Sequence, residues 1–250
     1  MNLFENNRNY WTGRTMGYSK VNEEELKSGQ KEKWLNLLTR ALPKAEHGCK
    51  VLDMGTGPGF FAILLAEAGY DVTAADCTDS MLERAKCNAG IYKDQINWVL
   101  CDAQKTGIKE ESFDAVVSRN LTWNLEHPET AYEEWLRILK KGGVLLNFDA
   151  NWYQHLFDQK MREGYERDRN LVLEQKLEDH YTCTDIDAME KIAKMLPMGK
   201  VNRPQWDREV LYQLKAASIK TDESVWQEVW SEEETVNYGS TPMFFIQAVK

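Results

Sequence analysis

The sequence lacks the features that point to a membrane, a nucleic acid or a bound metal. No apolar run approaches the roughly 18 residues that span a bilayer, and the N-terminal stretch MNLFENNRNYW lacks the pattern of a secretory signal. Long basic runs are also missing, since 31 Lys and Arg stand against 40 Asp and Glu, for a formal net charge of -9. We therefore expect a soluble cytoplasmic protein with neither a membrane nor a nucleic-acid partner.

Cysteine is scarce and scattered. The five cysteines form no CxxC pair, so the sequence predicts neither a disulfide framework nor a metal site; they are Cys49, Cys77, Cys87, Cys101 and Cys183. Reduced thiols packed as small apolar side chains are the plain interpretation, and a position of Cys77 at a ligand pocket is the alternative.

The composition is that of a compact globular chain. Hydrophobic residues make up 42% of the 250 residues and charged residues 28%, which suits one core domain with a smaller elaboration. From residue 49 to 150, short apolar runs alternate with helical patterns. The runs lie at 51–54, 71–75, 96–100, 113–118 and 144–148, and the helical patterns at 61–68, 80–88 and 128–139. This alternation predicts a doubly wound α/β core with a mostly parallel sheet.

The flanking segments differ from this core in pattern. Residues 1–48 are polar and aromatic, with a helix expected over 23–42, and predict a helical cap. Residues 151–205 are charge-rich and helical and predict a lid inserted into the core. Residues 206–250 predict completion of the sheet, with a helix at 205–217 and an antiparallel edge pair of strands at 224–230 and 243–249.

The strongest motif is VLDMGTGPGFF, where an apolar run ends at Asp53 and glycines follow at positions 55, 57 and 59. Glycine permits a sharp turn and the close approach of a ligand. Phe60 stands where a dinucleotide-binding loop has its last glycine, and no Lys-Ser or Lys-Thr pair follows, so neither that loop nor a P-loop is predicted. A purely structural turn remains the alternative.

Two acidic residues fall at the ends of the next two expected strands. Asp76 ends DVTAAD and could accept hydrogen bonds from both hydroxyls of a ribose. Asp102 follows INWVL and could accept one from an exocyclic adenine amine. A helix cap or a solvated strand end is the alternative for either residue alone. Because the carboxyl ends of parallel strands share one edge of the sheet, the loop and both acids are expected to meet there.

This combination resembles the class I S-adenosylmethionine-dependent methyltransferases, in particular the small-molecule branch with a methyltransferase-11-like core, over about residues 48–150. The resemblance implies a Rossmann-like, seven-stranded sheet with an antiparallel C-terminal edge strand, and S-adenosylmethionine as the cofactor. It implies that Asp53 orders the loop and the methionyl end of the cofactor, and that Met81 packs on the adenine. The cofactor residues expected in full are Arg14, Tyr18, Asp53, Gly55, Thr56, Gly57, Gly59, Asp76, Cys77, Met81, Asp102, Ala103, Arg119 and Asn120.

The methyl acceptor is left open by the sequence. RNLTWN after the fourth expected strand departs from the aliphatic or His-rich stretch common in the family. Aromatic and polar residues in the cap and in loops after strands predict the substrate wall, with ordinary cap packing as the alternative: Tyr10, Trp11, Trp123, Asn124, Trp152 and Tyr153. Of the four histidines, His127 and His155 are the candidate general bases, whereas His47 and His180 are not favoured.

We therefore expect methyl transfer by in-line displacement to a small molecule in an enclosed pocket. The alternative is a non-catalytic subunit of the same fold that binds the adenosyl ligand or activates a partner. Neither a basic groove nor an N/D-P-P-Y motif for a protein or RNA substrate is present, and a homodimer is left open.

Overall fold

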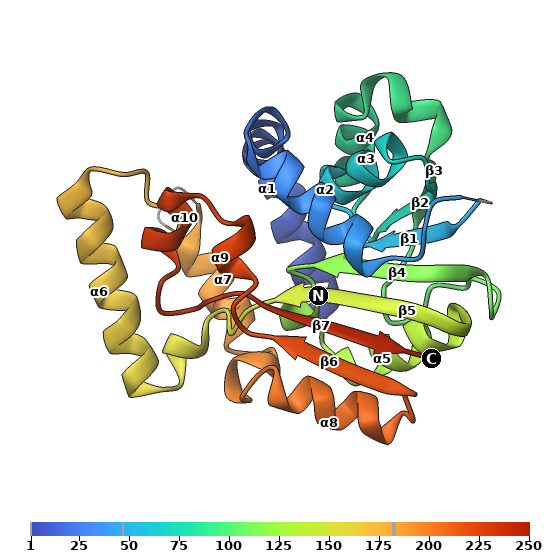
Figure 1. Cartoon of the computed structure of the whole chain (residues 1–250). Helices are drawn as coiled ribbons and strands as arrows, with labels where there is room; N and C mark the ends of the chain where they lie inside the picture. Colours follow the sequence, from blue (N-terminus) through green and yellow to red (C-terminus); the bar gives the residue numbers. More distant parts are fainter. Residues whose placement is uncertain (1, 47, 182–183) are drawn as a thin grey trace.

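A single mixed sheet runs through the computed structural model (Figure 1), which describes residues 2–46, 48–181 and 184–250. His47 and Cys183 lie outside the described residues. Within these ranges seven strands follow the order β3-β2-β1-β4-β5-β7-β6, and every neighbouring pair is parallel except the two that include β7. The strands are β1 (Lys50–Met54), β2 (Asp71–Asp76), β3 (Asn97–Leu100), β4 (Phe113–Arg119), β5 (Leu139–Asp149), β6 (Ser218–Asp222) and β7 (Phe244–Val249). The expected Rossmann-like fold class is confirmed.

Helices cover both faces of this sheet (Figure 1). On one side lie α1 (Leu3–Lys27), α2 (Gln30–Ala41), α3 (Phe60–Glu67) and α4 (Asp79–Asn88), and on the other α5 (Pro128–Ile138) and α8 (Gln205–Gln213). Val51 of β1 packs in one core with α2 and α3, whereas the next residue, Leu52, packs in a second core with α5. This alternation follows from the two-residue period of a strand, and it explains why strands covered on both faces read as continuous apolar runs.

Two expectations about the elements were wrong. The single helix over 23–42 is instead two helices, α1 and α2, and α1 begins at Leu3. The strand expected at 224–230 is instead a short helix, α9 (Trp226–Val229); its N-cap residue Val225 and its last residue Val229 are buried one turn apart. The sheet is completed by β6, whose residues alternate between exposed and half-buried and therefore give no apolar run to detect. The antiparallel strand β7 lies between β5 and this edge strand.

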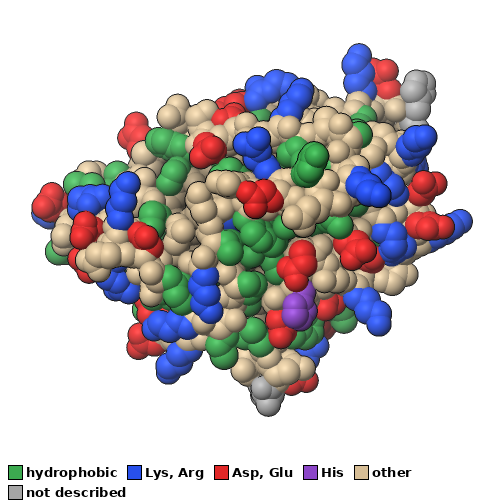
Figure 2. All heavy atoms as spheres, turned by 90° about the horizontal axis from the view of Figure 1, so that it is seen from below, with side chains coloured by type: hydrophobic (Ala, Val, Ile, Leu, Met, Phe, Trp, Pro, Cys, Tyr) green, Lys and Arg blue, Asp and Glu red, His purple; other side chains and the backbone are tan. Residues whose placement is uncertain are grey.

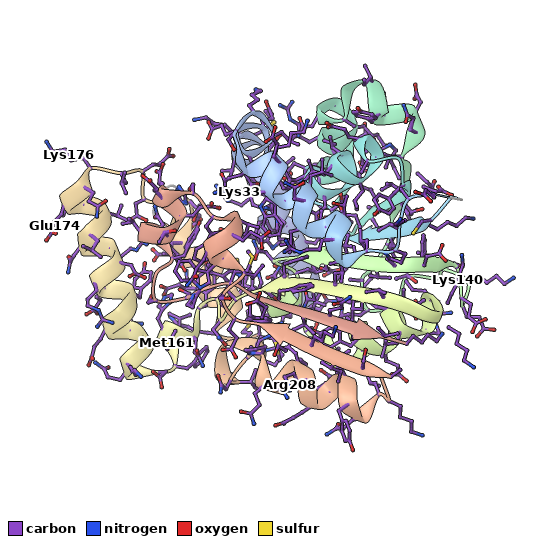
Figure 3. The ribbon with its side chains drawn as sticks, viewed as in Figure 1. Lys33, Lys140, Met161, Glu174, Lys176 and Arg208 are labelled. Carbon is purple, nitrogen blue, oxygen red and sulfur yellow. The ribbon has the colours of Figure 1, made fainter. Side chains whose placement is uncertain are left out.

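The segment between β5 and α8 projects from the sheet. It holds α6 (Gln159–Gln175) and α7 (Ile186–Ala193), with the 3-10 helices η3 (Gln154–Leu156) and η4 (Met198–Lys200). Glu174 and Lys176 mark the end of α6 that lies farthest from the sheet (Figure 3). The other elements are α10 (Glu232–Asn237), η1 (Gly90–Gln95) and η2 (Thr122–Asn124). A small apolar core joins Met189 and Ile192 of α7 to Trp123 of η2 and to the start of α1.

A buried charge network under η2 holds the end of this segment. Arg203 lies between Asp149 at the end of β5 and Asp207 on α8, at N–O distances of 2.7 Å for each pair, and all three side chains are fully buried. Asp149 also accepts a hydrogen bond from the Trp123 amide at 2.9 Å, and Arg203 Nη2 donates one to Thr122 Oγ1 at 2.6 Å. The network thereby fixes the backbone of η2.

The surface carries charges of both signs. On the face shown in Figure 2, Lys and Arg are interspersed with Asp and Glu, and apolar side chains gather near the middle of the view. Among the described residues, no helix combines the length and the apolar character that crossing a bilayer requires.

The Arg203 network yields a stability prediction. Arg203→Met leaves two carboxylates buried against each other without their cation, so we expect the free energy of unfolding to fall by about 3–5 kcal/mol. The matched control is Arg40→Met, which breaks the exposed pair with Glu228, whose side chains are 63% and 40% exposed. That change is expected to cost no more than about 1 kcal/mol. Urea unfolding of both variants is the measurement, and equal losses would contradict the prediction.

Candidate functional site

A cavity of about 880 Å³, partly open to solvent, lies at the carboxyl ends of β1, β2, β3 and β4. Helix α1 forms one wall, and η2 with the residues that follow it forms another. Ten of the residues predicted to bind a cofactor line it: Tyr18, Gly55, Gly57, Asp76, Cys77, Met81, Asp102, Ala103, Arg119 and Asn120. A smaller adjoining cavity of about 270 Å³ is lined by Asp53 and Thr56.

The glycine loop is shaped by the chain on both sides of it. The amides of Gly55 and Thr56 donate to the Ala75 carbonyl at 2.8 and 2.9 Å, which ties the loop to β2. Gly55 and Gly57 have positive φ, and a Cβ on Gly55 would lie 2.7 Å from Leu121 Cδ2. A Cβ on Gly57 would lie 3.3 Å from the Tyr18 ring of α1. The loop therefore has room for backbone only, as the sequence predicted.

Asp76 and Asp102 line the same cavity, as expected from their places at neighbouring strand ends. Asp76 accepts hydrogen bonds from the Gly57 amide at 3.0 Å and the Thr78 amide at 2.8 Å, and burial raises the pKa of its carboxyl. Asp102 Oδ1 accepts from the backbone amide and side chain of Gln104, at 2.8 and 3.1 Å. A carboxylate has about four lone-pair sites, so both groups retain acceptor capacity toward a ligand.

Asp53 orders the loop from within. Its side chain is 2% exposed, and its Oδ2 accepts hydrogen bonds from Thr56 Oγ1 at 2.6 Å and from the Ala62 amide at 3.0 Å. Burial raises the pKa of this carboxyl from 3.8 to about 6, although both hydrogen bonds and the charge of Arg119 oppose the shift.

The cap helix α1 covers this edge of the sheet. Arg119, at the end of β4, donates two hydrogen bonds to Glu25 of α1 at 2.7 and 2.9 Å, and its guanidinium lies 4.5 Å from the centre of the Phe60 ring. Arg84 of α4 pairs with Glu23 of α1 at 2.7 Å. Any ligand carboxylate that approached Arg119, one of the residues expected to bind the cofactor, would therefore have to compete with Glu25.

Two residues of the predicted cofactor set line neither cavity among the described residues. The guanidinium of Arg14 lies beside Gly17, one turn along its own helix. Gly59 has a positive φ, and its Cβ would lie 3.0 Å from the Ala85 Cβ, so this glycine lets α3 pack closely on α4.

The predicted substrate wall divides into two groups. Trp11 and Asn124 line the larger cavity. The other four residues, Tyr10, Trp123, Trp152 and Tyr153, pack in or against the small core between α1, α7 and η2, where Trp123 and Tyr153 stack at 5.2 Å. These four residues therefore pack the cap against the rest of the chain, which is the alternative that the sequence left open.

The two candidate bases lie outside the described lining of both cavities. His155 is 4% exposed and stacks on Tyr165 with ring centres 4.1 Å apart, and burial lowers its pKa to about 4. It is therefore neutral near pH 7 and packs against aromatic rings of its own segment, between β5 and α8. His127 is exposed at the N-terminus of α5, where its amide donates to Gln104 Oε1 at 2.7 Å, and its neighbour Glu126 lines the cavity.

Sequence reasoning missed the first turns of α1. They contribute Leu3, Phe4, Asn7 and Arg8 to the lining, and the loop after η2 contributes Leu125 and Glu126. A signal for this helix was present: the Asn2 side chain accepts from the Glu5 amide at 2.8 Å while Glu5 accepts from the Asn2 amide, and Asn-x-x-Glu is the spacing of a capping box.

The family model described as a methyltransferase domain matches residues 52–147. Demethylmenaquinone methyltransferase of Renibacterium salmoninarum is 33% identical over 126 residues, 50% of this chain and 51% of that protein. Glycine/sarcosine N-methyltransferase of Aphanothece halophytica is 37% identical over 131 residues, 48% of this chain and 47% of that protein. The chain thus spans about half the length of the curated relatives it matches.

Among solved structures, the chain is similar to phosphoethanolamine N-methyltransferase 2 of Haemonchus contortus, in complex with phosphomonomethylethanolamine and S-adenosylhomocysteine. The TM-score is 0.59 and the identity 17%, with 88% of this chain and 52% of that chain covered. At this identity the likeness concerns the fold.

The raised pKa of Asp53 predicts a pH dependence of stability. Between about pH 4 and 6 the folded chain holds the Asp53 proton and the unfolded chain has lost it, so the free energy of unfolding falls as the pH rises. Asp53→Asn removes this contribution, and the stability of the variant relative to the wild type should rise by about 2 kcal/mol between pH 4 and 7. Urea unfolding of both proteins at the two pH values is the measurement. A difference that does not change with pH would contradict the raised pKa.

Proposed function

We propose that the chain is an S-adenosylmethionine-dependent methyltransferase, which the match of residues 52–147 to a methyltransferase domain supports, and that it catalyses in-line methyl transfer from this cofactor to a small molecule in the cavity. One observation carries the proposal. The glycine loop after β1, Asp76 after β2 and Asp102 after β3 line a single cavity beneath α1.

The chemistry of the lining suits an adenosyl cofactor. Positive φ and the lack of side chains at Gly55 and Gly57 leave backbone against the ligand. Asp76 would hold the ribose hydroxyls, Met81 would pack against the adenine, and Asp102 with Ala103 would meet its polar edge. Asp53, Thr56 and Tyr18, around the smaller cavity, would hold the methionyl end.

When bound, S-adenosylmethionine supplies a methyl group on an electrophilic sulfonium. The chain's own contribution is to bind, orient and exclude water: α1 covers the glycine loop, and the Arg203 network fixes η2 opposite it. Positioning of this kind can supply most of the acceleration of a displacement reaction. Neither candidate histidine lines the cavity, so the proton that a hydroxyl or ammonium acceptor loses would pass to Glu126, which does, or to solvent through the open side of the cavity.

The remaining parts of the proposal concern the surroundings of the site. We propose that residues 1–48 act as the cap and 151–205 as the lid over a core of 49–150, with 206–250 completing the sheet. The small core between α1, α7 and η2 supports this, because it joins cap and lid beside the cavity. A small metabolite in the cytoplasm is the proposed acceptor.

Binding of S-adenosylhomocysteine tests the proposal. We expect the wild type to bind it in titration calorimetry, and Asp76→Asn to weaken binding by about 1–3 kcal/mol, because one acceptor of a charged hydrogen bond is lost. Asp71→Asn is the matched control: it makes the same change at the exposed, opposite end of β2 and should leave the affinity unchanged. Absence of binding by the wild type, or equal affinity of all three proteins, would contradict the assignment.

A further inference from the structure

The side chain of Asn7 meets the backbone of Asn124 where α1 and η2 form adjoining walls of the larger cavity. Asn7 Nδ2 donates a hydrogen bond to the Asn124 carbonyl at 2.8 Å, and both residues line the cavity. Asn124 is 7% exposed, and the bond that its neighbour Trp123 donates to Asp149 holds this backbone in place. The backbone at this junction is therefore fixed, whereas no hydrogen bond among the described residues holds the oxygen of either carboxamide.

Three polar atoms at this junction are buried without a partner among the described residues. They are the Oδ1 atoms of Asn7 and Asn124 and the Nε1 of Trp11, which lies one turn beyond Asn7 on α1. Because Asn7 Nδ2 is held by the Asn124 carbonyl, its Oδ1 points away from that bond. Buried polar atoms are nearly always hydrogen-bonded, so each of the three needs a physical explanation.

The surroundings of these atoms are apolar. Leu3 and Phe4 of α1, Leu121 and Leu125 beside η2, and Leu196 after α7 line the same cavity. Of the charged residues nearby, Arg8 is exposed and Glu126 is half-buried. Solvent therefore screens their electrostatic interaction with a ligand. The buried atoms are therefore the selective polar groups of this wall.

The following inference rests on the proposed function. We propose that the molecule to be methylated donates a hydrogen bond from an N–H or O–H group to Asn7 and Asn124, and that it accepts one from Trp11. A carboxamide oxygen only accepts and an indole N–H only donates, so the ligand must supply the complementary groups. Its carbon skeleton packs on the leucines. The substrate class is thus a small amphiphilic alcohol, phenol or amine, and small rotations of the two carboxamides bring their oxygens to face it.

The probes are a pool of alcohols, phenols and primary amines, with their methyl ethers and N,N-dimethylamines as matched partners. Each compound is added to the full chain saturated with S-adenosylhomocysteine, and binding is read from the melting temperature and by calorimetry. We expect members of the donor-bearing set to bind at least tenfold more tightly than their methylated partners, because a site that hydrogen-bonds a polar group rejects analogues that lack it. The two donor classes are read separately, which distinguishes hydroxyl from amine.

Substitutions of the two asparagines test whether these residues cause the preference for donor-bearing compounds. Asn7→Leu and Asn124→Leu should each lower affinity for the bound donor compounds at least tenfold and narrow or invert the preference over methylated partners. Asn36→Leu, the same change at an exposed position of α2, should leave the preference intact. A narrowed preference is a readout that loss of folding would not produce.

The outcomes separate this inference from the proposed function. Binding of S-adenosylhomocysteine with no preference for donor-bearing compounds, or with a preference that survives both asparagine variants, overturns the inference and leaves the proposed function standing. Failure of S-adenosylhomocysteine to bind overturns both.

Discussion

The cavity depends on the hydrogen bond that the Gly57 amide donates to Asp76 Oδ2 at 3.0 Å. It joins the loop after β1 to the end of β2, beside the two bonds that the loop amides donate to the Ala75 carbonyl. A parallel sheet brings the carboxyl ends of its strands to one edge, but only such cross-links fix the loops there relative to one another. With this geometry set, a ligand meets backbone on one side and a carboxylate on the other.

The second constraint is the cap. Helix α1 is polar for most of its length, yet it is held on the sheet by buried and half-buried pairs rather than by a broad apolar face: Glu25 with Arg119 and Glu23 with Arg84. Breaking a buried pair of this kind leaves an uncompensated charge, so these contacts favour one position of the helix over others. The helix thereby brings Tyr18 to the glycine loop and places Trp11 and Asn7 in the lining of the larger cavity.

The fold of the core, and the meeting of the glycine loop, Asp76 and Asp102 at one cavity, could be predicted from sequence because both are local in origin. Continuous apolar runs reveal the buried strands. Because the strands of a parallel sheet all end at one edge, an acidic residue at the end of such a run is placed at that edge. Polar pairings across the chain leave no such signal: Arg119 and Glu25 lie 94 positions apart, and Arg203 lies 54 from Asp149. The sequence drew attention to the aromatic residues but could not predict their surroundings. Side chains such as Trp123 and Tyr153 suit a packed core as well as the wall of a ligand pocket. β6 escaped prediction because an edge strand that is half exposed needs no apolar pattern.

The most direct test of the central claim is a crystal structure of the chain with S-adenosylhomocysteine. We predict the ribose hydroxyls within hydrogen-bond distance of Asp76, the adenine against Met81 and beside Asp102, and the methionyl end toward Asp53 beneath Tyr18. A ligand bound elsewhere, or bound with Asp76 and Asp102 both out of contact, would contradict the claim that these strand ends form one adenosyl site.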